Sequence, residues 1–317
     1  MTMMLLFWTL LISIILSIST SSFFSLWICL EINMMVFIPM MNSKNMLASN
    51  SMIYYFISQS LASTIFIFSI MLNLTYPLLF TFNTLLLTSS ILIKLGAAPF
   101  HIWFPEVMDG LKLEAVLILI SIQKIIPLYI LSFMNNFIMI LSIILSAIVG
   151  SLGGWNQNSI RKILAFSSIT HIAWLISLIM TSNHWWYLYF LTYSLIMISL
   201  LAFFIKNKMS LINQINISSM PLFQISLILT VLSLGGLPPF MGFFLKLLSI
   251  KLILSSAPFL LLFLIPSSLL NLFFYLRLLY PFLMKMINKN TTFENKKKII
   301  FLIPMHLSFL LFMIPLL

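Results

Sequence analysis

The chain has 317 residues, of which 62% are hydrophobic and 7% are charged. A soluble domain would carry about 25% charged residues, so the composition excludes a soluble globular protein and favours a polytopic helical membrane protein. The single cysteine, Cys29, excludes an internal disulfide or a thiolate cluster. The net charge of +11 lies mostly in short segments between apolar runs, which makes it a signal of membrane topology and not of a nucleic-acid partner.

Apolar runs long enough to cross a bilayer recur from one end of the sequence to the other. The first run, MTMMLLFWTLLISIILSIS, has no basic leader and no small-residue cleavage site, so we expect it to be a retained span. The predicted spans lie near residues 3–19, 22–41, 52–73, 77–98, 114–133, 136–154, 163–180, 184–205, 221–250, 257–280 and 299–317.

The run 221–250 contains GGLPPF and can be counted as one broken span or as two. If it crosses once, eleven basic residues fall on one side of the membrane, and the other side holds Lys251. The positive-inside rule favours this segregation, so we predict eleven spans, with the N-terminus on the positive side and the C-terminus opposite. The basic residues of the positive side are Lys44, Lys112, Arg161, Lys162, Lys206, Lys208, Lys285, Lys289 and Lys296–Lys298.

The first ten spans divide into two groups of five, which must cross the membrane in opposite senses because five is odd. In each group the fourth span is interrupted, by GAAPF at 96–100 and by GGLPPF at 235–240. This pattern is typical of inverted repeats in transporters. We therefore predict an all-α fold with a first five-helix repeat at 1–133, a second at 134–280, and a basic loop with a C-terminal transmembrane helix at 281–317.

Within the first ten predicted spans, five acidic, basic or histidine side chains fall near the centre of a span or beside an interruption: Glu31, Lys94, Lys124, His171 and Lys246. A charge at membrane depth costs about 2.5–3.5 kcal/mol even on lenient insertion scales. Glycine and proline leave backbone groups without helical partners, which is tolerated at this depth only where protein or water satisfies them. We therefore expect the lysines beside the two breaks to face an internal polar cavity.

Two readings of these residues remain open at this point. In the first, Glu31 forms a static ion pair with one lysine and holds helices together, which leaves two lysines without a carboxylate at depth. In the second, the residues relay protons, because burial and neighbouring like charges disfavour the ammonium form and let a lysine release and rebind a proton. Moving one charge against about 150 mV costs roughly 3.5 kcal/mol, which lies within the range of such environmental effects.

Other ionisable residues favour plainer roles. His101 and His184 lie at span ends without a third ligand, so we expect no metal site. Glu106, Asp109 and Glu114 cluster at the membrane edge, where solvation or helix capping is the first expectation and contact with a neighbouring subunit through Glu106 the second.

Five segments, in order along the chain, resemble the NADH dehydrogenase subunit 2 family, the mitochondrially encoded, antiporter-like membrane subunits of NADH:ubiquinone oxidoreductase (complex I). They are LEIN around Glu31, KLGAAPFHIWFPEV from Lys94, QKIIPL around Lys124, NQNSIRKILAFSSITH from Asn156, and LSLGGLPPFMGFFLK ending at Lys246.

The resemblance implies a core membrane subunit that carries a proton path coupled to electron transfer in other subunits. It maps the family's glutamate–lysine pair onto Glu31 and Lys94, its central lysine onto Lys124, and its distal broken-helix lysine onto Lys246. His171 matches a histidine of the family's polar axis.

The resemblance also implies that this chain binds no cofactor, whereas the parent complex contains NAD, FMN, iron–sulfur clusters and ubiquinone. The implied partners are other membrane subunits of complex I, including neighbouring antiporter-like subunits, together with membrane lipids. The implied location is the mitochondrial inner membrane, with the positive side facing the matrix. A stand-alone cation/proton antiporter of the same fold and a structural membrane subunit with static buried charges are the alternatives.

Overall fold

The computed structural model describes residues 2–43, 45–76, 78, 80–181, 184–207, 221–238 and 240–287, and nearly all of this length is helical. The helices are α1 (Thr2–Ser19), α2 (Phe23–Met41), α3 (Met46–Thr75), α4 (Phe80–Leu95), α5 (Trp103–Gly110), α6 (Leu113–Ile120), α7 (Ile122–Leu131), α8 (Phe137–Gly154), α9 (Ile160–Met180), α10 (Trp185–Asn207), α11 (Pro221–Gly235), α12 (Met241–Ser256), the 3₁₀ turn η3 (Pro258–Leu260) and α13 (Leu261–Ile287).

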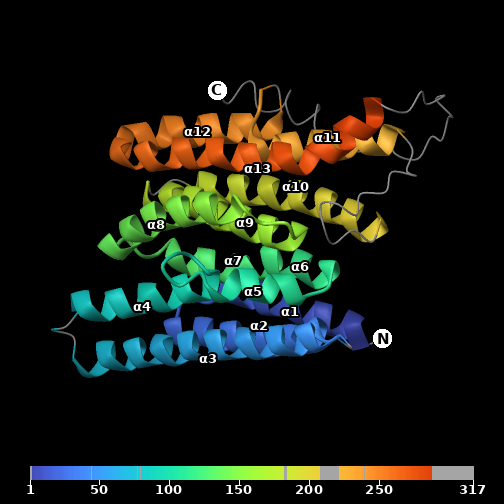
Figure 1. The fold of residues 1–317 in the computed structure, drawn as a ribbon. Coiled ribbons are helices and arrows are strands. Elements are labelled where there is room, and N and C mark those ends of the chain that lie inside the picture. The colour runs from blue at the N-terminus through green and yellow to red at the C-terminus, as the bar shows by residue number, and fades with distance from the viewer. Residues whose placement is uncertain are drawn as a thin grey trace.

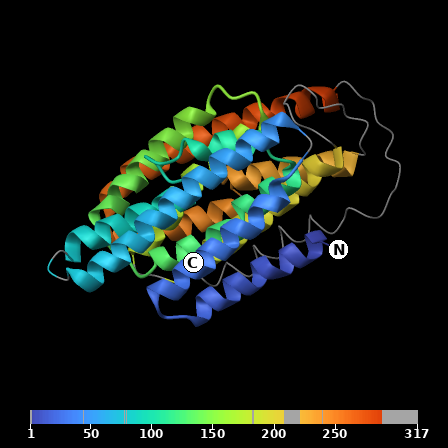
Figure 2. The same ribbon diagram turned by 90° about the horizontal axis from the view of Figure 1, so that it is seen from below.

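The helices lie side by side in stacked layers, with α1, α2 and α3 along one edge and α11, α12 and α13 along the other (Figure 1). α8, α9 and α10 fill the middle, and the view from below shows the same near-parallel packing (Figure 2). α13, the last helix of the described residues, ends at the same end of the bundle as the N-terminus (Figure 1).

The described part of the chain contains seven helical segments long and apolar enough to span a membrane, and three shorter apolar helices. The chain is therefore an all-helical, polytopic membrane protein. The seven are Phe23–Met41, Met46–Thr75, Leu113–Leu131, Phe137–Gly154, Ile160–Met180, Trp185–Lys206 and Pro258–Tyr280, and the shorter ones are Met3–Ser19, Phe80–Leu95 and Ser226–Gly235.

Parts of the topology prediction lie outside the described residues. They include the predicted last span, 299–317, and several basic residues of the predicted positive side. Among the basic residues of the predicted positive side, those whose side chains are not described are Lys44, Lys208, Lys285, Lys289 and Lys296–Lys298.

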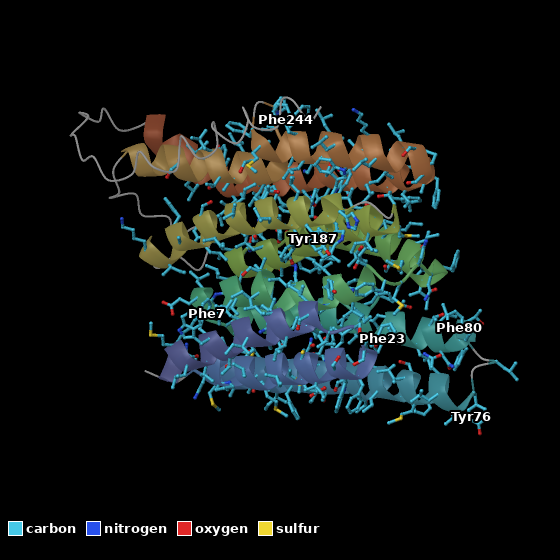
Figure 3. All side chains as sticks on the ribbon, turned by 180° about the vertical axis from the view of Figure 1, so that it is seen from behind. Phe7, Phe23, Tyr76, Phe80, Tyr187 and Phe244 are labelled. Atoms are coloured by element: carbon cyan, nitrogen blue, oxygen red, sulfur yellow. The ribbon has the colours of Figure 1, made fainter. Side chains whose placement is uncertain are left out.

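The outer surface of the bundle carries many large apolar side chains. Phe7, Phe23, Tyr76, Phe80 and Tyr187 are all more than a third exposed, and Figure 3 shows them distributed over the bundle and its ends. In water such a surface would be costly, whereas in a bilayer the lipid chains cover it.

α9 is the central helix. Its apolar residues are distributed over all sides, which predicts a helix without a solvent face, and its residues are buried along almost its whole length. Glycines of α8 allow the two helices to approach closely: a Cβ at Gly150 would lie 2.9 Å from the backbone nitrogen of Thr170, and one at Gly153 would overlap the ring of Phe166.

One interruption was not predicted. The apolar run 114–133 forms two helices, α6 and α7, which meet at Ser121, where φ is −101° and ψ is −79°. The Ser121 hydroxyl donates to the Leu117 carbonyl at 2.6 Å, and Pro127 lacks the N–H that would bond a carbonyl one turn earlier. The regular α-helix is therefore interrupted just before Lys124.

Candidate functional site

Two helices end inside apolar surroundings with the same backbone arrangement. α4 ends before Gly96, which has φ +70°, and α11 ends before Gly236, which has φ +77°. In both places the next N–H, of Ala97 or of Leu237, donates to the carbonyl five residues earlier, at 3.1 and 3.3 Å. This is the Schellman arrangement, and glycine occurs there because side-chain-bearing residues rarely adopt positive φ. Both predicted interruptions are therefore present.

Glu31 and Lys94 lie at the first break. The Lys94 side chain is buried, and the charge of Glu31 acts on it and on the Tyr55 hydroxyl. However, no ion pair within 4.0 Å joins Glu31 to Lys94, and neither Glu31 Oε1 nor Lys94 Nζ has a hydrogen-bond partner among the described residues. The Gln59 amide donates to the Lys94 carbonyl at 3.4 Å, which adds a polar group to this region.

Lys124 lies in α7, one turn beyond the interruption at Ser121. Its side chain is 3% exposed, and in the described part of the chain its Nζ has no hydrogen-bond partner. The contact that the structure does show is with an aromatic ring: Nζ lies 4.9 Å from the ring centroid of Phe104 in α5.

His171 lies near the middle of α9 and is influenced by two of the predicted lysines. Its Nδ1 lies 2.9 Å from the hydroxyl of Tyr189 in α10, and its ring packs against that of Tyr193 with 4.5 Å between centroids. The charges of both Lys124 and Lys246 act on the imidazole. His171 therefore lies within electrostatic range of the central lysine and of the lysine at the second break.

Lys246 lies across the second break. Its Nζ donates to the Gly235 carbonyl at 2.8 Å, at the C-terminal end of α11, where the helix dipole favours a positive charge. A Cβ at Gly236 would lie 2.9 Å from Cδ of Lys246 and 3.0 Å from its Nζ, so the lysine chain packs directly on the turn.

A small cavity joins His171 to Lys246. Tyr189, Tyr193 and Ser233 also line it, and its volume of about 10 Å³ is close to what one water molecule requires. His171 Nε2 is buried and has no hydrogen-bond partner within the described ranges. The apolar part of the cavity wall is formed by Ile196, Leu234, Gly242 and Leu245.

A cluster of charged groups joins α5 to the start of α9. Arg161 donates from Nη1 to the Asp109 carbonyl at 2.7 Å, and Lys162 lies 3.7 Å from Glu106 and 3.5 Å from Asp109. The acidic side chains predicted to be solvated or capping thus pair with basic residues predicted to lie at the positive surface. Arg277 of α13 donates to the Trp155 carbonyl at the neighbouring α8–α9 turn, at 2.8 Å.

Within the described ranges, no group of three or more His, Cys, Asp or Glu side chains is arranged to hold a metal ion. The imidazole of His101 contacts the Pro99 carbonyl, with 3.2 Å between Nδ1 and the oxygen.

Sequence reasoning identified the ionisable residues but not their contacts. It missed Phe104, Tyr189 and the turn at Ser121. Tyrosines within an apolar span carry one usable signal, because a buried hydroxyl requires a partner, but the sequence does not say which one.

Residues 20–271 match the family described as NADH:quinone oxidoreductase/Mrp antiporter, TM. The chain also superposes on a chain in the structure of respiratory complex I from Thermus thermophilus with bound aureothin, with a TM-score of 0.81 and 24% identity, covering 86% of this chain and 69% of that one. The fold is therefore that of the antiporter-like membrane proteins.

Two mosquito relatives are more similar in sequence. NADH-ubiquinone oxidoreductase chain 2 of Anopheles gambiae is 45% identical over 304 residues, which cover 90% of this chain and 89% of the relative. Its counterpart from Aedes aegypti is 40% identical over 288 residues, covering 87% and 84%. The chain belongs to the NADH-ubiquinone oxidoreductase chain 2 family.

Proposed function

We propose that this subunit moves protons along a path formed by Glu31, Lys94, Lys124, His171 and Lys246. As a member of its family, the chain is an antiporter-like membrane subunit of respiratory NADH:ubiquinone oxidoreductase, the proton-translocating complex I. The redox chemistry takes place in other subunits, which hold NAD, FMN, iron–sulfur clusters and ubiquinone, and this chain binds none of them.

The observation that carries the proposal is the position of His171. It is buried in the central helix, within electrostatic range of both Lys124 and Lys246. Its Nδ1 contacts the Tyr189 hydroxyl, and His171 and Lys246 line the same small cavity. A neutral imidazole accepts a proton on one nitrogen and releases one from the other, which is the property a relay between two lysines requires.

The first break supplies the other end of the path. Because neither Glu31 Oε1 nor Lys94 Nζ has a hydrogen-bond partner among the described residues, the two atoms can approach or separate without breaking a hydrogen bond. Approach of the carboxylate favours the protonated lysine, and separation favours proton release. The second break differs, because Lys246 is already held by the Gly235 carbonyl.

The architecture that suits this function has eleven spans. Residues 1–133 form one five-helix repeat and residues 134–280 an inverted second repeat, with 281–317 adding a basic loop and a last transmembrane helix. The opposite directions of α4 and α11 in Figure 1 support the inversion, as do their matching Schellman ends.

The proposed location is the mitochondrial inner membrane, with the N-terminus in the matrix and the C-terminus on the opposite side. The predicted positive side includes Arg161 and Lys162, and the end of α13 lies at the same end of the bundle as the N-terminus (Figure 1), which supports this orientation. The proposed partners are other membrane subunits of the complex, neighbouring antiporter-like subunits among them, and membrane lipids.

Substitution of Lys124 by alanine tests the proton path. In membrane vesicles, the number of protons moved per NADH oxidised is measured, and NADH-dependent dye reduction gives the amount of assembled complex. We expect the assembled K124A complex to oxidise NADH with fewer protons moved per NADH. A normal proton ratio in the assembled variant would support static buried charges instead.

The matched control is Lys112→Ala, at the exposed N-terminal end of α6. It removes an exposed lysine at the residue that precedes α6, outside the apolar run that holds Lys124, so the proton ratio is expected to stay unchanged. A loss of equal size in both variants would point to a general effect of altered charge and against a path through Lys124.

A further inference from the structure

The short helix α5 lies between the first break and α6, and its first two residues are both aromatic. Trp103 donates from its indole Nε1 to the carbonyl of Ile93 at 3.0 Å, which ties the start of α5 back to the end of α4. Its ring packs edge-on against that of Phe104, with 5.5 Å between centroids. The position of Phe104 is therefore fixed relative to the break.

Phe104 contacts both the break and the central lysine. A Cβ at Gly96 would lie 3.0 Å from the Cβ of Phe104, so the glycine turn packs directly against this residue. On its other side, the ring lies under the ammonium group of Lys124, 4.9 Å from centroid to Nζ. Both Phe104 and Lys124 are almost completely buried, at 1% and 3% exposure.

The far end of α5 is held as firmly as its start. Gly110 packs against the carbonyl of Leu47 at the start of α3 so closely that a Cβ would overlap it. Arg161 bonds the Asp109 carbonyl, and Lys162 pairs with Asp109. With both ends fixed, α5 presents the Phe104 ring at a defined place and does not leave it free to follow the lysine.

We propose that Phe104 is a positioning residue of the proton path, whose ring face holds the ammonium group of Lys124 beside the turn at Gly96. The proposal rests on the proposed role of Lys124 in proton transfer. The electron-rich face of an aromatic ring attracts a cation within about 6 Å, and the attraction strengthens when both groups are removed from water. The ring gives Lys124 a favourable site that carries no charge and no proton of its own.

This arrangement explains how a buried lysine can be charged part of the time. A carboxylate partner would hold the ammonium form strongly, whereas an aliphatic pocket would disfavour it strongly. A ring face lies between these limits, since a desolvated cation–π contact changes the ratio of protonated to neutral amine by roughly 30-fold. The contact exists only while the lysine carries its proton, so it is lost when the proton moves on.

The test compares four variants of the assembled complex: Phe104→Leu, Phe104→Tyr, Phe37→Leu and Lys124→Ala. Leucine keeps the bulk and the apolar character but removes the ring face, and tyrosine keeps the ring face. Phe37→Leu is the matched control, because Phe37 is a fully buried ring of the same core cluster and packs on Tyr55. Protons moved per NADH are measured in vesicles, with dye reduction as the measure of assembly.

We expect the fall in protons moved per NADH in F104L to be at least half of the fall in K124A. F104Y should keep most of the normal ratio, and F37L should keep the normal ratio. A normal ratio in F104L beside a reduced ratio in K124A would overturn the role of Phe104 and leave the proton path intact. A normal ratio in K124A would overturn both. Equal losses in F104L and F37L, or failure of F104L alone to assemble, would show that the ring is needed for packing and would also overturn the proposal.

Discussion

The two helix breaks have similar backbone conformations and differ in what their lysines contact. Gly96 and Gly236 follow α4 and α11 with similar positive φ, and in each turn the glycine N–H and the next N–H donate to carbonyls three and five residues earlier. Lys246 follows its glycine on the next helix and reaches back to the Gly235 carbonyl, whereas Lys94 precedes its glycine. Among the described residues, the ammonium group of Lys94 has no hydrogen-bond partner.

In the proposed proton path, the two similar breaks would serve different purposes. A lysine bonded to a helix end has a fixed position and a fixed partner, which suits a site that receives a proton. A lysine with a nearby carboxylate but no contact to it can respond to small movements, which suits a site where coupling begins. Four experiments test this distinction.

The largest effect is expected from Gly242, which brings α12 against the end of α11. A Cβ at this position would collide with the carbonyl oxygen of Ser233, and backbone cannot rotate away as a side chain can. Overpacking of this kind costs about 1–3 kcal/mol or more, so Gly242→Ala should sharply lower the amount of assembled complex. Native gels stained for NADH-dependent dye reduction measure that amount.

Gly235→Ala is the control for this substitution. A Cβ there would meet the side chains of Leu272 and Tyr275 at 3.7–3.8 Å, which is ordinary contact, so assembly should be preserved. If G242A assembled as well as G235A, this would contradict the close packing of α12 against the end of α11 at the second break.

The second experiment replaces each break lysine by methionine, which keeps the length of the side chain. Lys246→Met removes the donor to the Gly235 carbonyl, and an unsatisfied buried carbonyl costs about 1–3 kcal/mol. Lys94→Met removes an ammonium group that lacks such a bond. We expect both variants to move fewer protons per NADH, but K246M to be less stable than K94M by several degrees in thermal inactivation of the solubilised complex.

Equal thermal stability in the two methionine variants would contradict the distinction between a held and an unheld lysine. The exposed Lys112→Met serves as the reference for both, since it removes the same charge without touching either break.

The third experiment tests the contact between His171 of the central helix and Tyr189 of α10, near the second break. Tyr189→Phe removes the hydroxyl that meets His171 Nδ1 at 2.9 Å, and the loss of one buried hydrogen bond costs about 1 kcal/mol. We expect a partial fall in protons moved per NADH with assembly near normal, because the imidazole loses the group that orients it. Tyr187→Phe, two residues away on the same helix and exposed, should have no effect on the ratio. Equal ratios in the two variants would argue against a relay through His171.

The sequence predicted the breaks and the buried ionisable residues better than their contacts. Gly96 and Gly236 could be predicted because the turn requires positive φ, which restricts the residue type. Lys94 and Lys246 could be predicted because a charge stands out within an apolar run. The break at Ser121 could not, because a serine in a helix is compatible with several local structures.

Contacts between helices depend on packing that local patterns do not contain. Phe104 and Lys124 are twenty residues apart, on α5 and α7 with α6 between them, and Tyr189 meets His171 across the α9–α10 connection. An apolar span predicts that such a ring is buried but not what it is buried against. The division at residue 133 and the last span at 299–317 stay predictions.

The smallest effect is expected at the surface end of α5, where the first break connects to the charged cluster. Lys162 pairs with Glu106 and Asp109 at 3.7 and 3.5 Å, and these carboxylate side chains are 57% and 41% exposed. Exposed ion pairs contribute about 0–1 kcal/mol, so Lys162→Gln should shift thermal inactivation by a degree or two at low salt and by less at high salt. The proton ratio should not change, because three other contacts still hold α5. Gly110 packs against the Leu47 backbone, Arg161 bonds the Asp109 carbonyl, and Trp103 bonds the Ile93 carbonyl. A large loss of protons moved per NADH in K162Q would mean that the position of α5 depends on this pair, and that the first break responds to charge at the membrane surface as well as to Glu31.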